Sequence, residues 1–181
     1  MMKKALLALC LGVSSASAAT ILGFGVEADY LAPSATGDFK YKSINTAFDG
    51  ETESGYQVGA YFEHPVPLIP NLRLDYTSDV TFNGTSSDVA IGQMDITPYY
   101  EILDNIVDID IGVTAKVLNG KSKKAGAEET FNAVIPMGYF AAAVMVPGTG
   151  FSLAGSVKYI NYSGDSMTDA RIKAVMDIVA G

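Results

Sequence analysis

Apolar and polar residues alternate along most of the segment from Asn105 to Asn119. The apolar positions are Val107, Ile109, Ile111, Val113, Ala115 and Val117, and the positions between them include Asp108, Asp110, Gly112, Thr114 and Lys116. Successive side chains of a β-strand point to opposite faces, so a strand here has one apolar face and one charged face. A helix with 3.6 residues per turn would scatter the same charges all round its axis. The pattern therefore predicts a β-strand.

The same two-residue period recurs along most of the chain and predicts an all-β protein of about eight strands. The expected strands are Thr20–Leu31, Gly55–Glu63, Asn71–Phe82, Asp88–Ile102, Asn105–Asn119, Thr130–Met145, Phe151–Tyr162 and Thr168–Ile178. In the last of these, Ile172, Val175, Met176 and Val179 also fall at helical spacing, and Gly181 could end a helix. A helix is therefore the alternative to the favoured strand.

The N-terminus has the three parts of a secretory signal peptide. Lys3 and Lys4 give a positive start, Ala5–Val13 is apolar, and Ala16–Ala18 is a small-residue cleavage site. The apolar run is too short to be a membrane-spanning helix. We therefore expect residues 1–18 to be a cleaved signal peptide.

The remaining residues, 19–181, show no break in composition and are expected to form one domain. Loss of Lys3 and Lys4 changes the formal net charge from −8 to −10, which argues against a nucleic-acid partner. The only cysteine, Cys10, is removed with the signal peptide, so thiol chemistry is not expected. A lipid anchor on Cys10 is disfavoured because the bulky Leu9 precedes it.

Export combined with alternating strands predicts an antiparallel, up-and-down transmembrane β-barrel in the cell outer membrane. Its expected partners are outer-membrane lipid and the barrel-assembly machinery. The longest connections, Ala32–Ser54 and Gly120–Glu129, are expected to be outer loops, and the proline-rich His64–Pro70 an inner turn. Aromatic residues gather mostly near the predicted strand ends, as in interfacial girdles. They are Tyr30, Tyr56, Tyr61, Phe62, Tyr76, Phe82, Tyr99, Tyr100, Tyr139, Tyr159 and Tyr162.

Several strings resemble a family of short proteobacterial outer-membrane proteins that has no established activity. The strings are Tyr99–Asn105, Asp108–Ala115, Ile135–Tyr139, Tyr159–Ser166 and Asp169–Arg171. The resemblance covers most of the mature chain and implies a barrel without an assigned reaction. Family members continue with further strands and finish on an aromatic residue, whereas this chain reads Val179-Ala180-Gly181 at its end. The comparison therefore predicts that a C-terminal part is missing.

Charged residues from most of the predicted strands fall on the polar faces and are expected to form a charge network inside the barrel. They are Glu27, Asp29, Arg73, Asp75, Asp95, Asp108, Asp110, Lys116, Lys158, Arg171 and Lys173. An eight-stranded barrel is just wide enough to be filled by side chains, and buried charges must be paired. A packed network is therefore favoured over a narrow cation-preferring pore.

No catalytic, cofactor or metal site is predicted. His64 is the only histidine and lies in an expected turn, so a Ser/His/Asp triad cannot be assembled plausibly. Asp108 and Asp110 lack the glycine turn of a calcium loop.

The leading hypothesis is a non-enzymatic outer-membrane barrel with a structural role or a binding role in its outer loops. One alternative is a small channel for ions or apolar molecules. Another is a soluble periplasmic barrel that holds a lipophile against an inward apolar face. Alternation alone does not say which face is inside. The aromatic strand ends and the loop lengths favour the membrane barrel.

Overall fold

The computed structural model describes residues 6–7, 10–17, 23–31, 36–41, 44–66, 68–104, 106–124, 127–163 and 165–176. These residues form strands and turns, with no helix among them. The strands are β1 (Leu6–Leu7), β2 (Cys10–Ser17), β3 (Gly23–Leu31), β4 (Thr36–Tyr41), β5 (Ile44–Thr52), β6 (Gly55–Glu63), β7 (Asn71–Gly84), β8 (Asp88–Leu103), β9 (Val107–Lys124), β10 (Ala127–Val146), β11 (Phe151–Tyr162) and β12 (Asp165–Met176).

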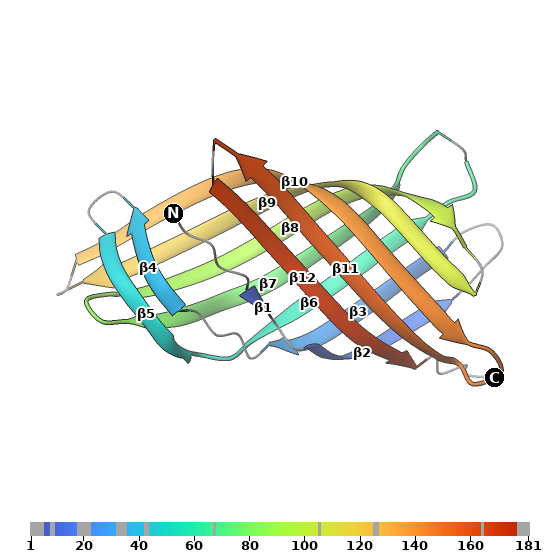
Figure 1. Cartoon of the computed structure of the whole chain (residues 1–181), viewed down its shortest axis with the longest axis horizontal. Helices are drawn as coiled ribbons and strands as arrows, with labels where there is room; N and C mark the ends of the chain where they lie inside the picture. The colour runs from blue at the N-terminus through green and yellow to red at the C-terminus, as the bar shows by residue number, and fades with distance from the viewer. Residues whose placement is uncertain are drawn as a thin grey trace.

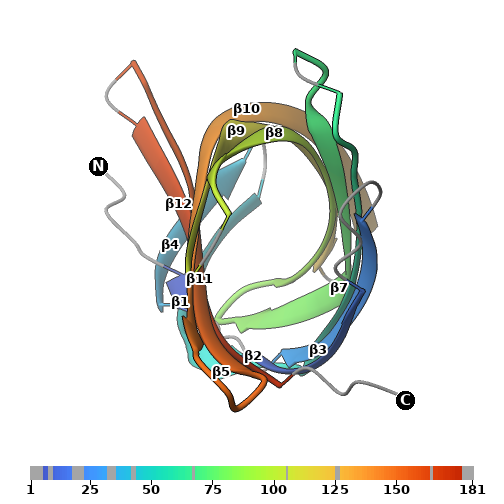
Figure 2. The ribbon, with the colours of Figure 1, turned by 90° about the vertical axis from the view of Figure 1, so that its right-hand side faces the viewer.

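Eight strands, β3 and β6 to β12, form an antiparallel up-and-down meander in which each pairs with the next. Among the described residues, the hydrogen-bonded order of strands begins with β1, which pairs with β12, and ends with β2, which pairs with β3. The described parts of β1 and β2 do not pair with each other, so the sheet is open between them. The strands are long and lie obliquely (Figure 1), and the sheet curls round on itself as a half-barrel (Figure 2). The predicted fold class, an antiparallel β-barrel with about eight strands, is confirmed in this partial form.

The expected strands match the meander closely. The bounds of β6 and β11 are those predicted, and the last strand, β12, is a strand and not the alternative helix. Ends that fall on residues 20–22, 105 and 177–178 lie outside the described residues, as do residues 179–181. Two segments of the expected signal peptide are described as strands: β1 pairs with β12, and β2 pairs with β3. The other residues of the expected signal peptide, including Ala18, lie outside the described part of the chain.

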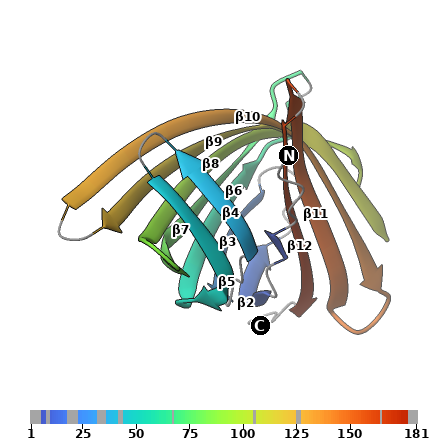
Figure 3. The ribbon, with the colours of Figure 1, turned by 60° about the vertical axis from the view of Figure 1, so that its left-hand side comes forward.

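Two predicted loops are largely strand, which corrects the sequence-based boundaries. The segment Ala32–Ser54 contains the β4–β5 hairpin, and β5 pairs with the end of β7 through Phe48↔Gly84 and Thr52↔Phe82. The segment Gly120–Glu129 extends β9 to Lys124 and begins β10 at Ala127. Together these strands form an extension beyond the barrel (Figure 3). The polar composition of these segments suggested loops. A strand can nevertheless carry polar side chains on exposed faces, provided that a neighbouring strand forms hydrogen bonds with its backbone.

A small apolar cluster holds the extension together. Val89 and Phe131 are buried, with Phe48 and Ile91 packed against them. The ring of Phe131 lies over Gly120, where an added Cβ would come within 1.9 Å of the ring. Gly120 is therefore needed for close approach between β9 and β10.

The convex face of the half-barrel is apolar and exposed. Ile111 and Val113 are 46% and 61% exposed, whereas Thr114 and Lys116, on the concave face, are 1% and 0% exposed. The apolar face changes to polar at the paired residues Asn119 and Asn132, both exposed, where the extension begins. The described part of the chain contains no helix that is long and apolar enough to cross a membrane.

The expected aromatic residues divide between the two faces. Tyr30, Tyr56, Tyr76 and others are exposed, and the rings of Tyr56 and Tyr76 lie 6.4 Å apart. Tyr99 and Tyr139, by contrast, are buried, as is Phe82. The prediction of an outward girdle is therefore wrong for these three, and also for Tyr61, which lines the interior cavity, because their positions are on the interior side of their strands.

Candidate functional site

The concave face gathers charged side chains from strands that are distant in sequence. At its centre is Lys116 of β9, which is fully buried. Its Nζ donates to Oδ2 of Asp95 and to Oδ2 of Asp169, each at 2.9 Å. One lysine thereby links β8, β9 and β12.

Lys158 of β11 extends this centre across the interior. Its Nζ donates to Oδ2 of Asp75 at 3.2 Å and also to Asp95. Since β7 and β11 are not neighbours in the sheet, the contact crosses the space that the half-barrel encloses. Arg171 of β12 pairs with Asp169 on the same strand, through Nε and Nη2 at 3.3 Å.

A second centre forms around Glu27 of β3, which pairs with both Arg73 of β7 and Lys173 of β12. Arg73 also donates through Nε to Asp75 at 3.0 Å, and Lys173 lies 3.2 Å from Asp29. The contacts of Lys173 join the first and last strands of the meander.

Arg73 reaches Glu27 across the intervening strand β6, at the position of Gly59. A Cβ on Gly59 would lie 2.7 Å from Oδ1 of Asp75 and 3.2 Å from Nη2 of Arg73. Absence of a side chain at Gly59 therefore makes room for the ion pairs above it.

These groups constitute the charge network, which balances. It contains five acids (Glu27, Asp29, Asp75, Asp95, Asp169) and five bases (Arg73, Lys116, Lys158, Arg171, Lys173). Mutual pairing offsets the cost of removing each charge from water.

The sequence-predicted residues all belong to the network except Asp108 and Asp110. Asp169 was missing from that set, although it stands on the polar face of the predicted last strand. The two remaining acids lie nearer the end of the barrel, where β9 begins, and line a cavity there.

Uncharged polar groups fill the next layer of the interior, and the sequence analysis missed them because their residue types carry no charge. The hydroxyls of Thr97 and Thr114 lie 2.8 Å apart. Gln57 donates to Asp75 at 3.4 Å and accepts from Thr77 at 3.4 Å. The concave face is therefore filled with mutually hydrogen-bonded groups over several strands.

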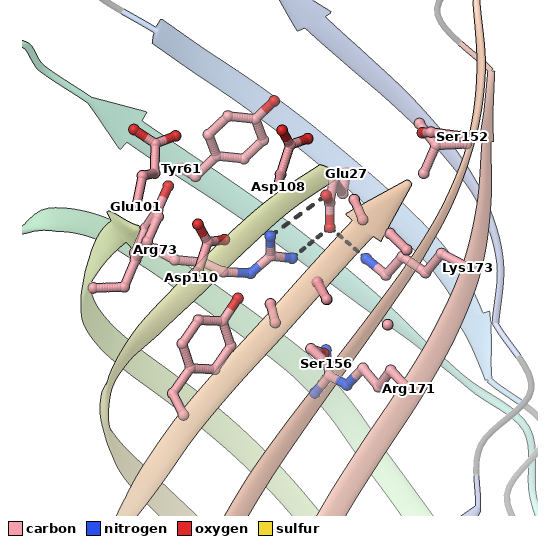
Figure 4. Close-up of a pocket in the computed structure, with 18 of the residues that line it drawn as sticks. Glu27, Tyr61, Arg73, Glu101, Asp108, Asp110, Ser152, Ser156, Arg171 and Lys173 are labelled. Carbon is pink, nitrogen blue, oxygen red and sulfur yellow. Dashed lines mark hydrogen bonds and ion pairs between the residues drawn. The ribbon is translucent and has the colours of Figure 1, made fainter. Parts of the chain in front are cut away.

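The cavity occupies about 330 Å³ beside the charge network, at the end of the barrel that carries the short turns. Five acids, called here the acidic group, line one part of it: Glu63, Glu101, Asp104, Asp108 and Asp110. In Figure 4 the labelled members Glu101, Asp108 and Asp110 lie on one side, and Arg171, Lys173, Ser152 and Ser156 on the other. The ion pairs of Glu27 lie between them.

Neutral donors orient part of the acidic group. The hydroxyl of Tyr99 donates to Oε1 of Glu63 at 2.8 Å, and Nδ2 of Asn71 donates to Oε2 of Glu101 at 3.2 Å. The rings of Tyr99 and Tyr139 meet edge to face, 6.2 Å apart. The inward tyrosines thus form part of the cavity wall.

Neither a metal centre nor a histidine-dependent site is seen in the part of the chain that the structure describes. His64 follows β6 and stabilises the turn: its N–H donates to Asn71 Oδ1, and its Nδ1 accepts from the Val66 N–H. No group of three or more His, Cys, Asp and Glu side chains among the described residues is arranged to hold a metal ion.

The chain matches no protein-family model, no curated protein and no solved structure. The fold and the interior are therefore the observations on which a functional proposal rests.

Proposed function

We propose that this protein is a non-enzymatic β-barrel of the bacterial outer membrane. The observation that carries the proposal is the polarity of the two faces. Apolar side chains such as Ile111, Val113 and Leu153 are exposed on the convex face, while the concave face holds the charge network. A soluble barrel that binds a lipophile needs the opposite arrangement, with apolar side chains inside.

The height of the apolar face agrees with a membrane. The outward apolar positions of β9 run from Val107 to Val117. At about 3.3 Å per residue and a tilt of about 45°, such a segment covers roughly 25 Å, the height of the apolar band of outer-membrane barrels. Polar residues follow at Asn119 and Asn132, where the strands would leave the bilayer.

The channel alternative has less support. Lys116, Asp95 and Asp75 are at most 2% exposed, and their ion pairs cross the enclosed space. We propose that the network closes the interior to ions, and that the role is structural or lies in binding by the extension of β4, β5, β9 and β10. Extra-membrane segments of this kind commonly carry binding functions.

We also propose that the chain groups with the short proteobacterial outer-membrane proteins it resembles. The resembling strings Tyr99–Asn105 and Asp108–Ala115 meet as the β8–β9 hairpin. The support is that these strings, which resemble the central hairpin of that family, lie on two strands that pair with each other.

Cell fractionation combined with gel mobility tests the proposal. The expected result is recovery of the protein in the outer-membrane fraction, with a band that migrates differently before and after heating because a folded barrel resists detergent. Recovery in the soluble periplasmic fraction would refute the membrane location. Stable single-channel steps in planar bilayers would instead refute the closed interior and favour the channel.

A further inference from the structure

The N-terminal segment of the chain lies at both edges of the sheet. β2 pairs with β3 along Phe24–Leu31, and β1 pairs with β12 at Asp169 and Ala170. β2 also lies close to β12, so this segment fills the seam between the first and last strands of the meander (Figure 3). Both β1 and β2 belong to the expected signal peptide, residues 1–18. Removal of that peptide takes away the neighbour of both edges.

The direction of β2 does not suit an up-and-down barrel. Each of the eight strands of the meander runs opposite to its neighbour, so the eighth strand, β12, runs opposite to the first, β3. β2 is antiparallel to β3 and therefore runs parallel to β12, as β1 does. A direct pair between β3 and β12 would instead be antiparallel, like every other pair of the meander.

Ion pairs already bridge the seam. Lys173 of β12 pairs with Glu27 and lies 3.2 Å from Asp29, both on β3. On β2, Ser14 is the partner of Glu27 and Gly12 is the partner of Asp29, so β2 is the strand between these charges. The ion pair between β3 and β7 spans β6 in the same way. Since neighbouring strands lie about 4.8 Å apart, β3 and β12 are separated by roughly 9.5 Å while β2 is in place.

The facing sides of β3 and β12 are complementary. On the convex face both strands are apolar and exposed, with Phe24, Val26 and Tyr30 on β3 and Ile172 on β12. On the concave face β3 carries two acids and β12 two bases, at alternate positions of each strand. A direct pair of the two strands would thus keep apolar side chains outside and place opposite charges together inside.

Charge also selects the register of that pair. With Lys173 opposite Glu27, antiparallel geometry places Arg171 opposite Asp29, so both positions join an acid to a base. A shift of two residues in either direction keeps only one acid–base pair. A shift of one residue would turn the apolar side chains of β12 inward.

We propose that residues 10–17 hold the barrel open as a temporary strand, and that their removal lets β3 pair directly with β12, with Lys173 opposite Glu27 and Arg171 opposite Asp29. The inference rests on the proposed β-barrel and adds the event that closes it. Closure satisfies the backbone groups of both edges, which is required in lipid because no water is there to bind them. The open sheet is then the form that precedes removal of the signal peptide.

Cysteine cross-linking before and after removal of residues 1–18 tests the proposal. The full chain carrying Cys10→Ser, Ala28→Cys and Ile172→Cys is folded in detergent, one half is cut with signal peptidase, and mass spectrometry verifies the cut. Directly opposed residues of antiparallel strands have Cα atoms about 4.5–5.5 Å apart, within the reach of about 7 Å that a disulfide allows. The separation of roughly 9.5 Å across β2 exceeds that reach. Oxidation should therefore cross-link the cut chain at least about tenfold more than the uncut chain.

Two further cysteine pairs are controls. Leu153→Cys with Ala174→Cys joins β11 and β12, which pair directly, so it should cross-link in both forms. Ala28→Cys with Ala174→Cys is two residues out of the assigned register and should cross-link far less than the pair with Ile172. Equal cross-linking of Ala28→Cys and Ile172→Cys before and after the cut would overturn the proposal. So would its absence after the cut, a preference for position 174, or a chain that signal peptidase leaves intact.

Hydrogen exchange on the unmodified chain is a second test, which needs no substitution. About half of the amides of an edge strand point away from its one neighbour. Among the described residues β12 pairs with β1 only at Asp169 and Ala170, so cutting should slow exchange of roughly half of the amides in 169–176, while β3 stays protected. Faster exchange in β3 after the cut would contradict closure. Fractionation measures the membrane location separately, so failure of closure and failure of the membrane proposal are distinguishable.

Discussion

Replacement of Lys116 by methionine is the most direct test of the charge network. The parent lysine is fully buried and donates to Asp95 and Asp169, both at 2.9 Å. Methionine has a similar length and apolar stem, so the change removes the ammonium with little loss of packing. Both carboxylates keep one other partner, Lys158 and Arg171 respectively. The interior is left with one unbalanced negative charge.

We expect Lys116→Met to lower the free energy of unfolding by about 3–5 kcal/mol, the usual cost of removing one partner from a buried ion pair. Urea unfolding in detergent, followed by far-UV circular dichroism because the chain has no tryptophan, measures the effect. Lys123→Met, in the extension and exposed, is the matched control and should change stability by less than about 0.5 kcal/mol.

A second substitution separates charge balance from local packing. Addition of Asp169→Asn to Lys116→Met restores equal numbers of acids and bases in the network. The double variant should therefore be more stable than the sum of the two single effects predicts, by about 1–3 kcal/mol. The reasoning is refuted if Lys116→Met costs no more than Lys123→Met, or if the two substitutions simply add.

The remaining predictions concern backbone space and the lipid face. Gly59→Ala should destabilise the fold by about 1–3 kcal/mol, because its Cβ would lie 2.7 Å from the ion-paired carboxylate of Asp75. Gly138→Ala is the control: no atom lies nearer than 3.7 Å to its Cβ, so it should be neutral or slightly stabilising. Equal effects of the two substitutions in urea unfolding would contradict the close approach at Gly59. Ile111→Arg should lower the free energy of unfolding in a bilayer by about 2–4 kcal/mol, because the arginine would face lipid. Asn132→Arg, which lies beyond the apolar face, should change it very little. Equal costs in refolding titrations would show that the convex face does not contact lipid.

The sequence by itself determined where most strands of the meander lie and which side of each is polar. The two-residue period of Asn105–Asn119 is a local property, since neighbouring side chains of an extended backbone must point in opposite directions. That rule gave the bounds of β6 and β11 and the exposed side of Ile111 and Val113. The same rule placed most of the charged residues on the polar face of their strands.

Only the tertiary structure decided what each inward residue meets. Thr114 and Asp110 stand on the same side of β9, yet Thr114 is packed against Thr97 and Asp110 lines a cavity. Polar residues such as Gly120–Lys123 are strand because β8 supplies a pairing partner. Asp169 completes the centre around Lys116 from a strand more than fifty positions away. Register between strands and the curl of the sheet fix these contacts, and neither is encoded in the period of any single strand.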